Sequence, residues 1–176
     1  TLNGAALNPS DATLTPGAAP GPASGSITMN PNGTITVAAG TTAGTYAYNY
    51  TICEIVNPSN CDTATATVVV TAPVIDAVND DFSAAPVNGY IGGTAGNVLG
   101  NDTLNGATVN PALTTITLVN NGGLAGVSIA DNGNMTVPAG TPAGTYTMAY
   151  VLCEDLNAGN CDTATAAILV DPAIIV

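Results

Sequence analysis

Apolar and polar residues alternate along two long stretches of this chain, and the two stretches resemble each other. Residues 44–70 read GTYAYNYTICEIVNPSNCDTATATVVV, and residues 144–170 read GTYTMAYVLCEDLNAGNCDTATAAILV. A period of two predicts β-strands, because successive side chains of a strand point to opposite faces. Each stretch therefore predicts a strand, a loop between two cysteines and a second strand. One face of the first strand carries Tyr46, Tyr48, Tyr50 and Ile52.

The similarity extends over most of the chain, with an offset of about 100 residues. Residues 31–70 and 131–170 are identical at 23 of 40 positions, and the TLNG that begins at Thr1 returns at Thr103. Fixed self-similarity of this kind is typical of repeat architectures. Asn-Gly pairs between alternating residues predict a further hairpin in each copy. The sequence therefore predicts an all-β chain of two tandem β-sandwiches.

The second copy is complete, whereas the first has no counterpart of residues 77–102. We therefore expect the domains to be residues 1–76 and 77–176, with opening strands of the second around residues 81–87 and 97–99. A sandwich without its opening strands has an open edge and an apolar groove. Either the chain is part of a longer array, or another subunit supplies a strand there.

The charge is entirely negative, with twelve acids, no Lys, no Arg and no His, for a net charge of −12. A chain without cations cannot neutralise phosphates, so we expect no nucleic-acid partner and no anionic membrane surface. The longest apolar runs are too short to span a bilayer, so we expect no direct membrane insertion. Metal cations fit this charge better, although acidity also serves solubility alone.

Four cysteines form two pairs with seven residues between partners: Cys53, Cys61, Cys153 and Cys161. A zinc site needs a tighter spacing or additional ligands, and the chain has no His. We therefore expect two disulfides, each stabilising its loop by roughly 2.5 kcal/mol in the chain-entropy model. Such bonds persist in oxidising compartments, so we expect a mature or excised segment of an exported protein.

The order of the motifs resembles bacterial tandem Ig-like and cadherin-like surface repeats, most of all those of long adhesins and fibres in Bacteroidota-type bacteria. The resemblance rests on AVNDD from Ala77, VLGNDT from Val98, the Asn-Gly hairpin, the AGTY corner and the closing TATxxVV strand. It implies two Ig-like or cadherin-like sandwiches on the cell surface, the first without its opening strands. The AGTY segment also resembles the tyrosine corner of Ig folds, with Tyr46 and Tyr146 in that role.

Cadherin-like relatives often bind calcium at domain junctions through Asp and Asn oxygens, and no other cofactor is implied. The resemblance places such a site at Asp76, Asn79, Asp80, Asp81 and Asp102. The alternative is that Asp80 and Asp81 solvate a linker and cap a turn.

Three threonines follow the Asp-Thr-apolar pattern of O-glycosylation in Bacteroidota-type exported proteins: Thr63, Thr103 and Thr163. Attached glycans are therefore expected there.

Catalysis has few candidate residues. Without His, Lys or Arg, and with paired cysteines, no Ser-His, Cys-His or Lys nucleophile can be built. The remaining carboxylate pairs, such as Glu54 with Asp62, flank a small stapled loop. We therefore expect no enzyme.

Two structural functions remain. One is the subunit of an extracellular, pilus-like filament on the bacterial surface, in which copies join head to tail and a strand is donated into the incomplete first domain. The apolar residues 167–176, AILVDPAIIV, are the expected donor or connector. The other function is a passive stalk segment of a large multi-repeat adhesin.

Overall fold

The computed structural model describes residues 1–23 and 25–175, and the regular structure in them consists of β-strands, so the all-β prediction is confirmed. The chain divides into two compact units, Thr1–Ala72 and Pro73–Val176. The division falls a few residues before residue 76, because the short strand Ile75–Asp76 pairs within the second unit. None of the described residues forms a helix that could cross a membrane.

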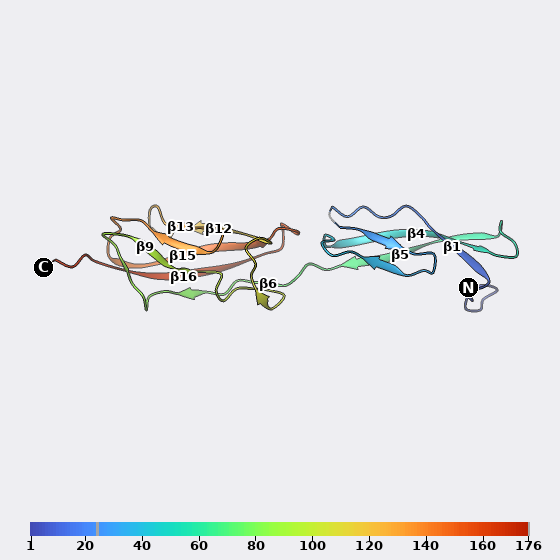
Figure 1. Cartoon of the computed structure of the whole chain (residues 1–176), viewed down its shortest axis with the longest axis horizontal. Coiled ribbons are helices and arrows are strands. Elements are labelled where there is room, and N and C mark those ends of the chain that lie inside the picture. Colours follow the sequence, from blue (N-terminus) through green and yellow to red (C-terminus); the bar gives the residue numbers. More distant parts are fainter. Residues whose placement is uncertain (24, 176) are drawn as a thin grey trace. The chain divides into compact units, whose positions relative to one another are not determined.

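The first unit has two small sheets that share one core (Figure 1). The larger has the order β1 (Ala12–Pro16), β4 (Gly44–Glu54), β5 (Cys61–Val70), and the smaller is the hairpin of β2 (Ile27–Met29) and β3 (Ile35–Val37). The buried residues between them are Ile27, Met29 and Tyr48.

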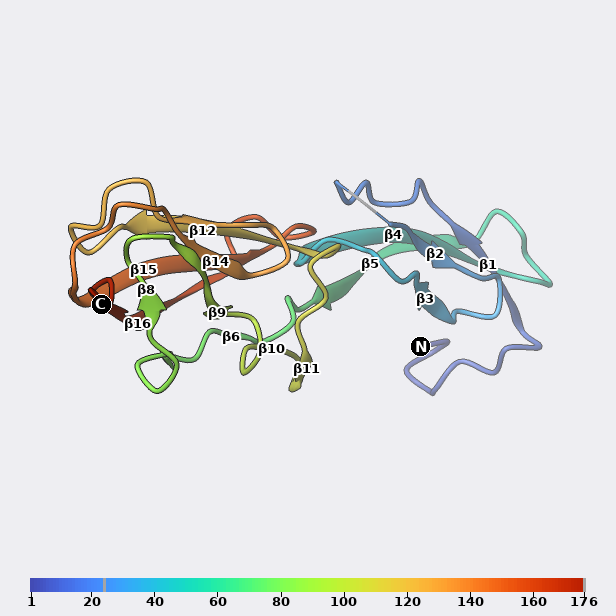
Figure 2. The ribbon, with the colours of Figure 1, turned by 60° about the vertical axis from the view of Figure 1, so that its left-hand side comes forward.

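The second unit repeats this arrangement with more strands. Its larger sheet has the order β12 (Thr114–Asn120), β15 (Gly144–Glu154), β16 (Cys161–Asp171), β7 (Asp80–Asp81), and β8 (Val87–Asn88) also pairs with β16. Its facing sheet has the order β13 (Ser128–Ile129), β14 (Asn134–Val137), β9 (Gly93–Asn97). A small third sheet has the order β11 (Ala107–Thr108), β10 (Thr103–Leu104), β6 (Ile75–Asp76) (Figure 2).

The opening strands of the second unit differ from those we expected. Residues 81–87 do not form one strand, because a turn in which Ala85 N–H donates to Phe82 O separates β7 from β8. The strand expected at residues 97–99 instead ends at Asn97, whose side chain accepts the N–H of Leu99. Val98 and Leu99 then enter the core as buried residues after the strand.

The long hairpin of each unit follows the predicted alternation. In the first unit the register runs from Gly44 opposite Val70 to Cys53 opposite Cys61, and β15 and β16 repeat it 100 positions later. The tyrosine-corner expectation is also met, because the hydroxyls of Tyr46 and Tyr146 each donate to a backbone carbonyl four residues upstream, at 2.9 Å.

Candidate functional site

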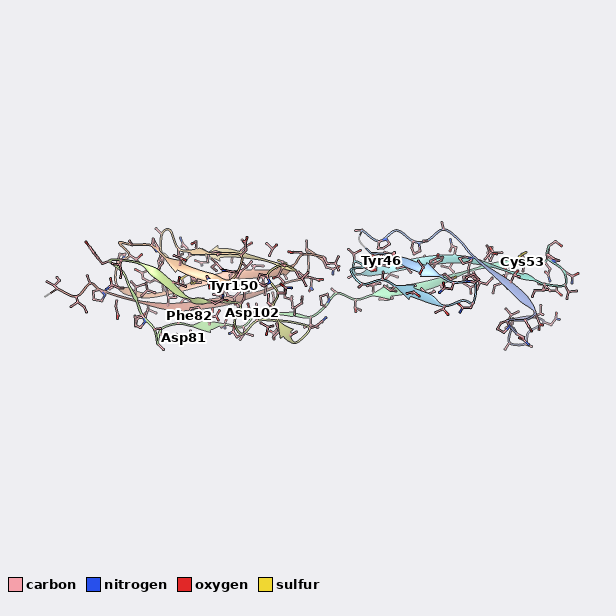
Figure 3. All side chains as sticks on the ribbon, in the orientation of Figure 1. Tyr46, Cys53, Asp81, Phe82, Asp102 and Tyr150 are labelled. Carbon is pink, nitrogen blue, oxygen red and sulfur yellow. A yellow bond between two sulfur atoms is a disulfide. The ribbon has the colours of Figure 1, made fainter. Side chains whose placement is uncertain are left out.

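The disulfides form as predicted, one at the loop end of each long hairpin. Figure 3 labels Cys53 of the first unit. Cys53 bonds Cys61 and Cys153 bonds Cys161, and in both pairs the Cα atoms lie 4.1 Å apart. Each bond joins two residues that already face each other in the ladder. The bonds therefore lock the hairpin ends.

The carboxylates beside the disulfides organise the loops. Glu54 accepts a bond of 2.9 Å from Asn60 Nδ2, and bonds from Asn60 and Asn57 lower the pKa of Glu54. Glu154 accepts equivalent bonds from Asn157 and Asn160. These acids hold loop amides in place, which is a structural role.

The calcium candidates Asp80 and Asp102 both accept a hydrogen bond from the hydroxyl of Tyr150, inside the second unit. Figure 3 labels Asp102 and Tyr150. Asp102 is 1% exposed; its carboxylate accepts the N–H of Val78 at 2.7 Å and lies 3.1 Å from the Tyr150 hydroxyl. Burial, together with the negative charge of Asp102, raises the pKa of Asp80 to about 6. Burial also raises the pKa of Asp102. Burial and the charge of Asp102 therefore disfavour the charged form of Asp80.

The other three candidates make different contacts, although the charge of Asp76 also raises the pKa of Asp102. The side chain of Asn79 accepts bonds from Thr165, and that of Asp81 accepts the N–H of Ser83, which makes Asp81 a turn cap. Asp76 lies in β6. Within residues 1–23 and 25–175 no group of three or more acidic, His or Cys side chains has the geometry to hold a metal. Calcium binding stays a prediction.

The expected glycosylation sites lie on strands. Thr63 and Thr163 are exposed residues of β5 and β16, while Thr103 is half-buried in β10. The backbone N–H groups of Thr63 and Thr163 donate to the preceding Asp side chains at 2.8 Å. Glycan attachment also stays a prediction.

The main difference between the units lies on the closing strand. In the second unit β7 and β8 pair in parallel with the outer edge of β16, and its inward residues Ala164, Ala166, Ile168 and Val170 are buried. In the first unit, no described residue pairs with that edge of β5, and the corresponding residues Ala64, Ala66, Val68 and Val70 remain exposed or half-buried. The first unit therefore presents an open strand edge with apolar side chains beside it.

A groove of about 240 Å³ lies at the loop end of this open side. It is lined by residues of the amino-terminal turn, of β4 and of β5, among them Leu2, Tyr50, Glu54, Asn60 and Asp62. Sequence reasoning predicted an apolar groove in the first unit but did not place these residues along it. Their recurrence as Leu104, Tyr150, Glu154, Asn160 and Asp162 was the available signal.

No protein-family model and no curated protein sequence matches the chain. Among solved structures, it is similar to extracellular cadherin domains 3–6 of protocadherin gamma B2, with 10% identity, a TM-score of 0.45, and coverage of 93% of this chain and 42% of that chain. It is also similar to the human desmocollin-1 ectodomain, with 11% identity, a TM-score of 0.41, and coverage of 92% and 33%. An endo-fucoidan hydrolase of glycoside hydrolase family 107 matches with 17% identity, a TM-score of 0.37, and coverage of 93% and 24%.

The chain thus spans less than half the length of these three structures. With TM-scores below 0.5, this likeness assigns neither a family nor a role to the chain.

Proposed function

We propose that this protein is a non-enzymatic structural subunit of an extracellular bacterial surface filament. Copies join head to tail, and the open first unit accepts a strand from its neighbour. Two disulfides in a chain of this size suit an oxidising, extracellular location.

The open edge of β5 is the observation that supports this proposal. An unpaired strand edge beside apolar side chains is a template for another chain. The second unit demonstrates the completed form, because β7 and β8 cover the same edge of β16. A donor from another copy forms a heterologous contact, and such contacts propagate into open fibres.

Electron microscopy of the purified protein over a range of concentrations tests this function. We expect filaments whose axial repeat equals one or two sandwich lengths, and size-exclusion profiles that shift with concentration. A folded, monodisperse monomer at every concentration would instead support the stalk of a multi-repeat adhesin. The tandem repeat is the observation that favours this alternative, since preceding repeats of the same chain would then complete the first unit.

Two modifications of the filament follow as proposals. Calcium at Asp80 and Asp102 would relieve the repulsion between their carboxylates, and a calcium titration that raises the melting temperature would support it.

Glycans at Thr63, Thr103 or Thr163 would raise the intact mass of material from the native source above 17.1 kDa.

A further inference from the structure

The second unit contains a small strand joint beside its TLNG turn. β6 pairs with β10, so Ile75 lies opposite Leu104 and Asp76 lies opposite Thr103. Asn105 N–H donates to Val74 O at 2.7 Å, and Val74 N–H donates to Asn105 Oδ1 at 2.9 Å. Asn105 adopts a φ of 53°, a left-handed conformation that Asn tolerates. The turn thus presents both a donor and an acceptor to the incoming strand.

The first unit contains the same turn without the incoming strand. Asn3 has a φ of 51°, and Leu2 pairs with Ala5 through two backbone bonds of 3.0 Å, as Leu104 pairs with Ala107. Among residues 1–23 and 25–175, none occupies the position beside Leu2 and Asn3 that β6 occupies beside β10. The turn is therefore formed and its outer side is open.

The groove next to this turn contains counterparts of the residues that contact the segment before β6 in the second unit. In the second unit Asn160 Nδ2 donates both to Glu154 and to Pro73 O, at 3.0 and 2.9 Å, and Glu154 is 5% exposed. In the first unit Asn60 makes the bond to Glu54, and no described residue accepts its second N–H. Among the described residues, the side-chain amide of Asn60 therefore has no counterpart of the Pro73 carbonyl.

The chain itself carries a second segment that corresponds to β6 and the residues before it. Residues 172–176 follow β16 as residues 72–76 follow β5, so Ile174 corresponds to Val74 and Ile175 to Ile75. Ile174 and Ile175 are 85% and 96% exposed. β16 extends to Asp171, so the predicted donor 167–176 is reduced to the residues beyond it. Residue 176 lies outside the described residues.

We propose that residues 173–175 of one copy add as a short antiparallel strand to Leu2 and Asn3 of a second copy. Ile175 lies opposite Leu2, Asn3 exchanges two bonds with Ile174, and Asn60 donates to the carbonyl of Ala173. Ile175 then packs against the first unit, as Ile75 packs against the second core, while Ile174 stays exposed like Val74. This joint rests on the proposed filament and specifies its contact.

Disulfide trapping between two different chains, each with one added cysteine beside its two native disulfides, tests the register. In the template joint Asn105 and Val74 form the hydrogen-bonded pair, so Leu104 and Ile75 form the closer, non-bonded pair, which suits a disulfide. An isotopically labelled Leu2→Cys chain is mixed with an unlabelled Ile175→Cys chain, and linked dimers are identified by mass. Ile174→Cys is the matched control, since it is similarly exposed but faces away from Leu2 in this register.

We expect mixed Leu2–Ile175 dimers in severalfold excess over Leu2–Ile174 dimers. Filaments in the same sample with equal trapping of both pairs would overturn this joint while leaving the filament function intact. Absence of both filaments and trapping would overturn both. A double variant, Leu2→Cys with Ile175→Cys, that links within single chains at high dilution would show that the tail occupies its own turn and would overturn the role of the second copy.

Discussion

At the scale of single residues, Tyr150 and Tyr50 occupy equivalent positions in the two units but have different surroundings. The hydroxyl of Tyr150 lies within 3.3 Å of oxygens from Val78, Asp80, Val98 and Asp102, and the ring is fully buried. Burial and the two acids raise the pKa of Tyr150, so it remains a donor. Tyr50 occupies the same strand position but is half-buried beside the groove.

Removing the hydroxyl of Tyr150 is therefore expected to destabilise the second unit. In Tyr150→Phe the buried Asp102 loses a hydrogen-bond donor, which should cost about 2 kcal/mol in the free energy of unfolding. Tyr50→Phe is the matched control, with an expected change below about 0.5 kcal/mol. Urea denaturation followed by circular dichroism measures both, and equal losses would contradict the assigned role of Tyr150.

The pair of Asp80 and Asp102 predicts a pH dependence. The pKa of Asp80 is 3.8 in a model peptide and about 6 in the fold, so the folded state binds more protons between these values. Stability from this group is fully present below the unfolded pKa and is lost as the pH rises through the folded pKa. We expect the melting temperature of the second unit to rise from about pH 7 to about pH 5. Asp80→Asn should flatten that rise; an unchanged slope would contradict it.

At the scale of elements, both units contain the same disulfide-linked hairpin. They differ in whether the outer edge of that hairpin is paired. β4 with β5 and β15 with β16 share one register and one disulfide position. Only β16 has partners on its outer edge among the described residues. The hairpin thus holds its shape through its own ladder, whereas its burial depends on the strands that cover it.

Replacing both cysteines of the second unit with Ser should lower its stability by about 2 kcal/mol, because the sequence separation of 8 closes a short loop. The expected register is unchanged, since ten ladder pairs remain. Differential scanning calorimetry of Cys153→Ser with Cys161→Ser measures the loss, and the equivalent pair in the first unit serves as the matched control. A lost transition would show that the disulfide is required for folding.

At the scale of the whole molecule, the two units have unequal cores. The buried apolar cluster of the first unit contains Ile27, Met29 and Tyr48, whereas that of the second also draws on its opening segment through Val87, Val98 and Leu99. Burial of apolar surface is the dominant favourable contribution to folding. We therefore expect the first unit alone to be the less stable of the two.

Calorimetry of the dilute chain should show two transitions, with the first unit melting at the lower temperature. Under filament-forming conditions the lower transition should rise, because a bound strand stabilises the state that it binds. The upper transition is expected to stay in place and acts as the internal control. A lower transition that is the same in monomers and filaments would contradict strand acceptance by the first unit.

Much of this architecture follows from local sequence patterns. The period-two alternation, the cysteine spacing and the Asn-Gly turns predict the long hairpins, since strand direction and short-loop closure depend on residues near one another. The opening strands were predicted less well, because β7 and β8 are two-residue segments held by pairing with the distant β16. Their boundaries depend on tertiary contacts.

The sequence by itself determined the all-β class, the two repeats and the disulfides, because each is a matter of period, spacing or self-comparison. Tertiary structure decided which acidic side chains are buried and which strand edge is left unpaired. Asp102 enters the core beside Tyr150, whereas Asp81 caps a turn. The sequence around these two acids does not distinguish the two roles. The turn at Leu2 and Asn3 is open because no described residue pairs with it as β6 pairs with β10. Whether a group lacks a partner depends on contacts between residues that are distant in the sequence.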